Sequence, residues 1–288
     1  MKTVARKLLF SLTENLWTAG FALAGRQRHP VQPWTSPGGH HILALAPHPD
    51  DEVAGCGGTL VRHHHAGDTT HLLFVTDGRA SRAGGLSPHQ MAERRASEAQ
   101  ESARALEITH VHWLGLPEND WPLEHLLQTF HNLFEKFPIS LIYAPSRVDF
   151  HPEHHKVAHG LALALRQMPD PPLVRAYQLH VPLGNLANLV CPIPEGASPS
   201  RAIRAYASQW GSLERVFRMW QYSSASYRQP YPVEVFWEMP GSTYVRLHQD
   251  PLPWPENLFR GLRPRPFTDP LAYIVGNHHR KTLKISSQ

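Results

Sequence analysis

Short apolar runs alternate with segments of helical pattern between residues 40 and 167. The first run, "HHILALA" at 40–46, is continuous, as expected of a strand that is buried on both faces of a parallel sheet. Similar runs cover 70–78, 109–116 and 140–145, and helical segments cover 53–67, 88–106, 123–137 and 153–167. Strands and helices that alternate at this spacing form right-handed βαβ units. The sequence therefore predicts a Rossmann-like α/β fold with a mostly parallel sheet and helices on both faces.

The pattern is less regular after Pro169. We predict a fifth strand at 173–183, one or two helices over 200–224 and a late strand at 231–239, followed by a tail rich in Pro and Trp. We find no internal repeat and no convincing linker, so we expect one domain with elaborated ends. Its parts are a lead-in at 1–39, the main domain at 40–240 and a C-terminal extension at 241–288 that packs on the domain.

Composition excludes several classes of protein. Of the 288 residues, 41% are hydrophobic, which is ample for a packed core. The formal net charge of +4 is spread along the chain, and without a run of Lys or Arg we expect no nucleic-acid partner. The two cysteines, Cys56 and Cys191, form no disulfide framework, which favours a reducing, cytoplasmic location.

The N-terminal segment has the spacing of an amphipathic helix. Val4, Leu8, Leu12 and Leu16 recur at helical intervals. No apolar stretch reaches the ~18 residues that a membrane-spanning helix needs, so we expect no transmembrane span. Two interpretations stay open: the helix packs on its own domain, or it lies on a membrane surface or on another subunit of a homo-oligomer.

Three consecutive acids follow the first strand, in "PHPDDE" at 47–52. The carboxyl edge of a parallel sheet is where ligands bind in such folds. His48 and Asp51 are three residues apart, so both side chains can converge on one point, whereas Asp50 projects differently. Imidazole and carboxylate together suit zinc or a similar divalent ion.

A matching element follows the fourth strand, in "VDFHPEHH" at 148–155. His151 and His154 are again three residues apart with a proline between them. Either element alone is more typical of a turn. Together, at the ends of two strands and each before a helix, they predict a metal site.

At this point the chain resembles the LmbE-like, or PIG-L, deacetylase family, whose members hydrolyse N-acetyl groups on amino sugars and related glycoconjugates. The family signature A-H-P-D-D-E is similar to residues 46–52, with one extra proline, and H-P-D-H is similar to residues 151–154, with Glu153 in place of Asp. Weaker similarities lie at 95–99, 114–117 and 206–209. The resemblance covers about residues 40–240.

The resemblance implies a mechanism. His48, Asp51 and His154 would be the ligands of Zn²⁺, or of another divalent ion such as Fe²⁺, leaving a coordination position for water. The ion lowers the pKa of that water to about 7. Asp50 would be the general base and would then protonate the leaving amine. The ion and a protonated His151 would stabilise the oxyanion.

Further residues are expected around this centre. Asp149 and Glu153 flank His151, and either could pair with its second ring nitrogen. Arg95 matches a family arginine that reaches sugar hydroxyls, although a surface ion pair with Glu98 or Glu101 is the alternative. Glu118 and Asp120, in the loop after the third strand, could hold hydroxyls from the other side.

The resulting hypothesis is a zinc-dependent N-deacetylase that acts on an N-acetylated amino sugar or glycoconjugate. One alternative is the same machinery acting on another amide, such as a larger acyl group or a thiol conjugate. Another is a glycan- or nucleotide-binding protein without turnover, against which Asp50 argues, because a binder needs no base beside the ligands. A dinucleotide oxidoreductase is disfavoured because no G-x-G-x-x-G follows the first strand.

Overall fold

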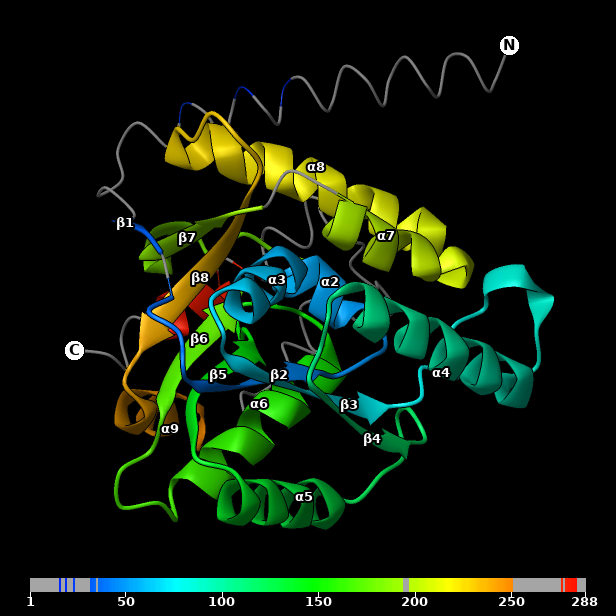
Figure 1. Cartoon of the computed structure of the whole chain (residues 1–288), viewed down its shortest axis with the longest axis horizontal. Coiled ribbons are helices and arrows are strands. Elements are labelled where there is room, and N and C mark those ends of the chain that lie inside the picture. Colours follow the sequence, from blue (N-terminus) through cyan, green and yellow to red (C-terminus); the bar gives the residue numbers. More distant parts are fainter. Residues whose placement is uncertain are drawn as a thin grey trace.

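The computed structural model describes residues 32–34, 36–193, 197–250 and 278–283, with single residues at 16, 19, 23 and 276. Within them, eight strands form one sheet in the order β1-β7-β8-β6-β5-β2-β3-β4 (Figure 1). The strands are β1 (Gln32–Pro33), β2 (His41–Ala46), β3 (Thr69–Thr76), β4 (His110–Leu116), β5 (Ile139–Pro145), β6 (Leu173–Tyr177), β7 (Leu189–Pro192) and β8 (Val233–Met239).

The sheet is mostly parallel, as predicted. Strands β4, β3, β2, β5 and β6 run parallel to one another, and β1 runs parallel to β7. Of the strands in the described part of the chain, β8 alone is antiparallel to its neighbours, β6 and β7. The mostly parallel α/β fold is therefore confirmed.

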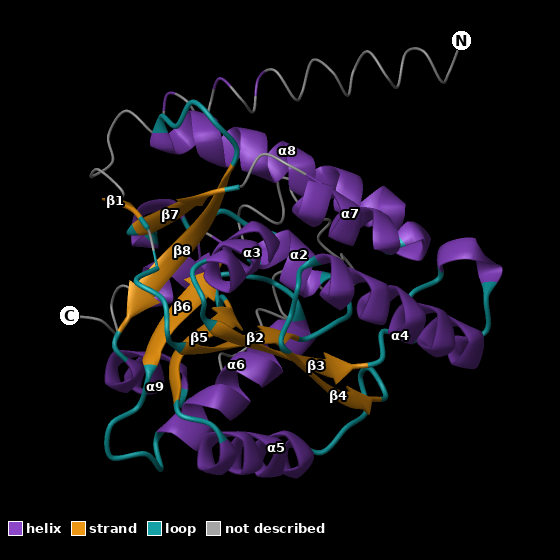
Figure 2. Ribbon diagram, in the orientation of Figure 1, coloured by secondary structure: helices purple, strands orange, loops and turns teal. Residues whose placement is uncertain are grey.

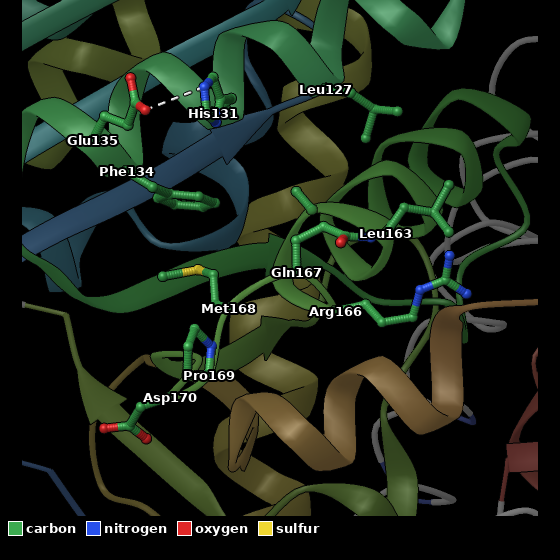
Figure 3. A pocket seen from close by; sticks show the side chains of 11 residues that line it. Leu127, His131, Phe134, Glu135, Leu163, Arg166, Gln167, Met168, Pro169 and Asp170 are labelled. Atoms are coloured by element: carbon green, nitrogen blue, oxygen red, sulfur yellow. Dashed lines mark ion pairs between the residues drawn. The ribbon is translucent and has the colours of Figure 1, made fainter.

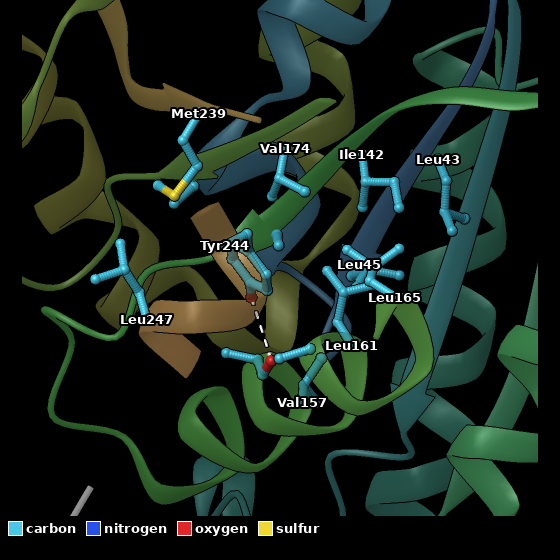
Figure 4. Close-up of a cluster of buried hydrophobic side chains, with 14 of the residues drawn as sticks. Leu43, Leu45, Ile142, Val157, Leu161, Leu165, Val174, Met239, Tyr244 and Leu247 are labelled. Atoms are coloured by element: carbon cyan, nitrogen blue, oxygen red, sulfur yellow. Dashed lines mark hydrogen bonds between the residues drawn. The ribbon is translucent and has the colours of Figure 1, made fainter. Parts of the chain in front are cut away.

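Helices cover both faces of the sheet (Figures 1 and 2). One face carries α5 (Leu123–Lys136), α6 (Pro152–Leu165) and α9 (Gly241–His248). The other carries α2 (Asp51–Gly55), α3 (Gly57–His65), α4 (Pro88–Ala105), α7 (Ala197–Ala205) and α8 (Trp210–Tyr227). Alternate residues of β2 point to opposite faces: Leu43 and Leu45 join the cluster under α5 and α6, shown in Figure 4, whereas Ile42 and Ala44 join the cluster under α3 and α4.

The first predicted helix is divided in the structure. Cys56 has non-helical dihedral angles, with φ −152° and ψ 16°, and separates α2 from α3. The first backbone N–H groups of α3 find a partner on β8, because Glu234 accepts hydrogen bonds from the amides of Gly58 and Thr59 at 2.7 and 2.8 Å. A long-range carboxylate thus caps this helix, which a local pattern does not reveal.

Other differences lie at the ends of elements. The fifth strand ends at Tyr177 instead of 183, and the short strands β1 and β7 were not predicted. The predicted N-terminal helix lies outside the described residues, except for Leu16, Ala19 and Leu23, which are helical and exposed. In the part of the chain that the structure describes, no helix combines the length and apolar composition needed to cross a bilayer.

Strands β2 and β5 position the predicted site. They are neighbours at the centre of the sheet, and the chain leaves β2 toward β3 on one side while β5 lies on the other. In open α/β sheets such a reversal of strand order opens a crevice at the carboxyl ends of the two strands. The loop that carries His48 and the first turn of α6, which carries His154, therefore lie at the carboxyl ends of neighbouring strands.

Candidate metal centre

The loop after β2 folds back on itself between His48 and Asp51. The backbone N–H of His48 donates to Asp51 Oδ2 at 2.8 Å, and the ring Nδ1 of His48 lies 3.1 Å from the same oxygen. The Pro47 carbonyl is tied to β3, accepting hydrogen bonds from the backbone N–H and the hydroxyl of Thr76 at 3.0 and 2.7 Å. The two side chains therefore lie together, as their spacing predicted.

Asp149 organises the loop after β5. Its Oδ1 accepts hydrogen bonds from the backbone amides of Phe150 and His151 at 2.6 and 2.9 Å. Its Oδ2 lies 3.1 Å from Nδ1 of His154, in the first turn of α6. Pro152 is the first residue of that helix, a position where its missing N–H costs nothing.

The two loops bring their imidazoles to a common point. His48, His151 and His154 each offer one ring nitrogen, and these nitrogens lie within 4.8 Å of one another. Asp51 Oδ2 lies 3.2 Å from Nε2 of His154. Nε2 of His48 and Nε2 of His154 are buried and make no hydrogen bond to the described residues. Buried ring nitrogens without a hydrogen bond, beside a carboxylate, are a donor set that fits a divalent cation.

Charge around this point also favours a cation. Burial opposes the ionisation of Asp51, but His154 and His48 outweigh it and hold the pKa of Asp51 well below its usual value. Burial likewise opposes a charge on His154, but Asp51 and Asp149 raise its pKa to about 10. Two carboxylates thus stabilise positive charge at one imidazole.

Asp50 lies beside this cluster and pairs with Arg95. Asp50 Oδ1 is 2.9 Å from Nη2 of Arg95, which also donates to the carbonyl of Pro49. Burial raises the pKa of Asp50 to about 6, although the Arg95 charge opposes this shift. The surface pair weighed for Arg95 is not formed, because Arg95 is buried and Glu98 pairs instead with Arg94 at 2.8 Å.

The two acids of the loop after β4 differ in position. Glu118 Oε1 lies 3.4 Å from Nε2 of His48, and its Oε2 accepts a hydrogen bond from the amide of Ala80 at 3.1 Å. Asp120 is exposed. The structure therefore brings Glu118 to the cluster, whereas no hydrogen bond or ion pair joins the Asp120 side chain to it among the described residues.

The carboxylate pairing expected for His151 is not what the structure shows. Asp149 is occupied by His154 and by backbone amides, and Glu153 accepts hydrogen bonds from Trp121 Nε1 and from the amide of Asn119 at 2.7 and 3.0 Å. The longer side chain of Glu153 reaches this neighbouring loop. Burial, with His48 and His154 nearby, keeps the pKa of His151 well below its usual value, so the expected protonated form is disfavoured.

His180 joins the site, although no motif in the sequence singles it out. Its Nδ1 lies 3.0 Å from Asp149 Oδ1, and its ring stacks on that of His154 with the centroids 5.1 Å apart. A strand predicted through residue 183 places His180 inside the strand, where a site residue is not expected. Since β6 ends at Tyr177, His180 lies just beyond the carboxyl end of a strand, where site residues are expected.

The C-terminal part of the chain reaches the same loop. His279 Nδ1 lies 3.0 Å from the carbonyl oxygen of Asp149, and Arg280 donates to the carbonyl of Pro182 at 2.6 Å. Leu283 is buried in the cluster under α5 and α6. Residues 279, 280 and 283 therefore contact the domain, whereas most of the segment between 251 and 277 lies outside the described residues.

A separate pocket of about 690 Å³ lies between α5 and the end of α6 (Figure 3). Apolar side chains such as Phe134, Leu163 and Met168 line it, with His131 and Arg166 among its polar residues. It contains none of the predicted site residues. The candidate metal centre is therefore distinct from this pocket.

Residues 43–165 match the family described as PIG-L: GlcNAc-PI de-N-acetylase. Over these residues, which are less than half of the chain, the protein is similar to the PIG-L family. The match includes His48, Asp51, His151 and His154. A diacetylchitobiose deacetylase of Thermococcus kodakarensis is 34% identical over 82 residues, which are 28% of this chain and 31% of that protein. The chain therefore matches less than a third of that relative's length.

Two solved structures show the same fold. N,N'-diacetylchitobiose deacetylase from Pyrococcus horikoshii superposes with a TM-score of 0.61 and 23% identity, over 71% of this chain and 85% of that chain. GalB, the 4-carboxy-2-hydroxymuconate hydratase from Pseudomonas putida KT2440, superposes with a TM-score of 0.60 and 16% identity, over 70% of this chain and 96% of that chain. Because a deacetylase and a hydratase share this fold, the function has to be argued from the site.

Proposed function

We propose that this protein is a metal-dependent hydrolase that removes the N-acetyl group from an amino sugar or its conjugate. The observation that carries the proposal is the convergence of His48, His154 and the Asp51 carboxylate on one buried point, with Asp50 beside them. The PIG-L match and the deacetylases among the similar proteins support this choice over other reactions on the same fold.

His48, Asp51 and His154 would hold the ion, since each contributes one atom to that point. Three protein ligands are typical of a catalytic zinc site, because they leave room in the coordination shell for a substrate oxygen or water. Zn²⁺ suits this donor set, and Fe²⁺ is the alternative. A bound divalent cation would lower the pKa of water and polarise the acyl carbonyl.

Asp50 would act as the general base. Arg95 holds Oδ1, which leaves Oδ2 as the atom that takes a proton from the attacking water. As the amide C–N bond breaks, Asp50 returns that proton to the leaving nitrogen, so that amide and water give acetate and a free amine. A pKa of about 6 keeps the carboxylate ionised near neutral pH and still able to carry a proton.

His151 would stabilise the oxyanion in its neutral form. Its Nδ1 accepts a hydrogen bond from the amide of Glu153 at 3.3 Å, which assigns the ring proton to Nε2. That N–H is a donor for the oxygen of the tetrahedral intermediate. Burial favours this neutral tautomer over the protonated His151 that the family resemblance implies.

Other residues would contact the substrate or the ligands. Glu118 and the partly exposed His180 lie at the edge of the cluster and are placed to meet sugar hydroxyls. Arg95, buried under Asp50, would act on the base more than on the sugar, and Asp120 could meet only an extended substrate. Asp149 would orient His154 through its second ring nitrogen.

The test combines metal analysis of the purified protein with acetate and amine release from a panel of N-acetylated sugars and glycoconjugates. Wild type, Asp50→Asn and His154→Ala would be compared. The proposal expects about one zinc per chain in wild type and Asp50→Asn, and little in His154→Ala. Acetate release from wild type alone would support it. Full metal occupancy without acetate release would favour another amide, and a hydration product would favour the GalB reaction class.

A further inference from the structure

Asp50 has a strained backbone. Its φ of 124° lies in a region that side-chain-bearing residues rarely adopt. Such a conformation costs on the order of 1–3 kcal/mol and persists only where surrounding contacts enforce it. The contacts that hold the Asp50 backbone therefore help to position its carboxylate.

Glu52 makes one of these contacts. Its Oε2 accepts a hydrogen bond from the backbone N–H of Asp50 at 3.0 Å. Arg95 holds the Asp50 side chain at 2.9 Å, and the carbonyl of Asp50 accepts from the amide of Ala54 at 3.2 Å. The direction of the Asp50 N–H therefore depends on the position of the Glu52 carboxylate.

The other oxygen of Glu52 is fixed by two hydroxyl groups. Its Oε1 accepts hydrogen bonds from Tyr206 at 2.5 Å and from Ser102 at 2.8 Å. Glu52, Ser102 and Tyr206 are all fully buried, so no water competes for these bonds. Ser102 lies on α4, seven residues after Arg95 and on the same face, and Tyr206 directly follows α7.

We infer that Tyr206 and Ser102 are positioning residues that act through Glu52 to hold Asp50 in its catalytic conformation. Neither hydroxyl touches the candidate ligands. The hydrogen bonds run from the hydroxyls to Glu52, and from the Asp50 amide to Glu52. The inference rests on the proposed function for its consequence in catalysis, but the hydrogen-bonded chain is a property of the fold.

The test compares Tyr206→Phe with Tyr244→Phe. Tyr244 is the matched control because its hydroxyl is as fully buried and donates only to a backbone carbonyl, that of Ala158 at 3.3 Å (Figure 4). Ser102→Ala and Glu52→Gln extend the series. Three readouts are measured on the full chain: kcat and KM for acetate release, zinc content, and hydrogen exchange of a peptide that covers residues 47–54.

Pro47 and Pro49 carry no amide hydrogen, so the Asp50 amide is one of six backbone amides in that peptide. We expect Tyr206→Phe to exchange faster there, to lose about 10-fold to 100-fold in kcat with little change in KM, and to keep its zinc. Tyr244→Phe should match wild type in all three readouts.

Two results would overturn the inference. One is exchange at 47–54 in Tyr206→Phe equal to that of wild type. The other is the same loss of kcat in Tyr244→Phe, which would mark a general effect of removing a buried hydroxyl. If wild type hydrolyses no substrate of the panel, the proposed function fails, and the exchange comparison still decides whether Tyr206 holds Asp50.

Discussion

Nη2 of Arg95 lies 2.9 Å from Oδ1 of Asp50, and both groups are largely removed from solvent. The pair joins α4 to the loop after β2, across 45 residues of sequence. A buried guanidinium beside the proposed base controls both the direction of the carboxylate and the pH at which it ionises. The first two predictions depend on this pair.

Replacing Arg95 by Met should move the acidic limb of the kcat/KM profile to higher pH. The positive charge of Arg95 opposes the burial that raises the pKa of Asp50 to about 6. Without that charge the pKa rises further, so a smaller fraction of Asp50 is ionised at any given pH below neutrality. A shift of roughly one pH unit is expected. A limb that stays in place, or moves to lower pH, would show that Asp50 is not the titrating base.

Gly78→Ala should impair activity by displacing Arg95. A Cβ at Gly78 would lie 2.7 Å from Cδ of Arg95, and the φ of Gly78 is +66°. Gly84→Ala is the matched control, because Gly84 has nearly the same φ, +65°, with no atom within 4 Å of the added Cβ. Acetate-release assays should show a loss of about 10-fold or more for Gly78→Ala alone. Equal losses in both variants would attribute the effect to backbone strain.

Zinc should stabilise the folded protein, and His154→Ala should abolish this effect. A ligand that binds only the folded state at 100 times its Kd adds about 2.7 kcal/mol to the free energy of unfolding. Thermal denaturation with added zinc, and after chelation, should therefore show a higher Tm with the metal in wild type. His131→Ala, on the exposed side of α5, is the control and should respond as wild type does. A zinc-dependent Tm in His154→Ala would place the metal elsewhere.

Ionisation of the buried Glu234 should lower the free energy of unfolding as pH rises. Burial raises its pKa from 4.5 to about 7, even though three hydrogen bonds from Gly58 and Thr59 favour the charged form. The folded state therefore binds this proton more tightly than the unfolded state. The resulting stability is fully present below pH 4.5 and is lost as pH rises through 7, by on the order of 3 kcal/mol.

Glu234→Gln should remove this dependence. Urea unfolding at pH 5 and pH 8 gives the free energy of unfolding for wild type and variant. The free energy of unfolding of wild type, relative to that of the variant, should fall between pH 5 and pH 8. Glu124→Gln, at an exposed position of α5, should follow wild type. A parallel pH dependence in wild type and Glu234→Gln would contradict the assignment.

The fold of residues 40–167 was predictable because each element carries its own local signal. Continuous apolar runs marked the strands, and helical periodicity marked α4, α5 and α6 to within a residue or two. The short strands β1 and β7 carry no such signal. The break at Cys56 depends on Glu234, 176 residues from Gly58, and so could not be read from the pattern around it.

The sequence by itself determined which residue types meet at the candidate centre. His48 and Asp51, and likewise His151 and His154, are three residues apart, and their loops follow two strands whose carboxyl ends share one edge of the sheet. Spacing and strand order are sufficient for that convergence. The structure placed these residues together as expected.

Only the tertiary structure decided the partners of the long and charged side chains. Glu153 reaches Trp121 rather than His151, Arg95 lies under Asp50, and His180 joins Asp149. Glu52 meets a tyrosine 154 residues away. The physical reason is that a buried charge takes whichever polar group the packed fold brings within hydrogen-bond distance, and that choice depends on segments far apart in the sequence.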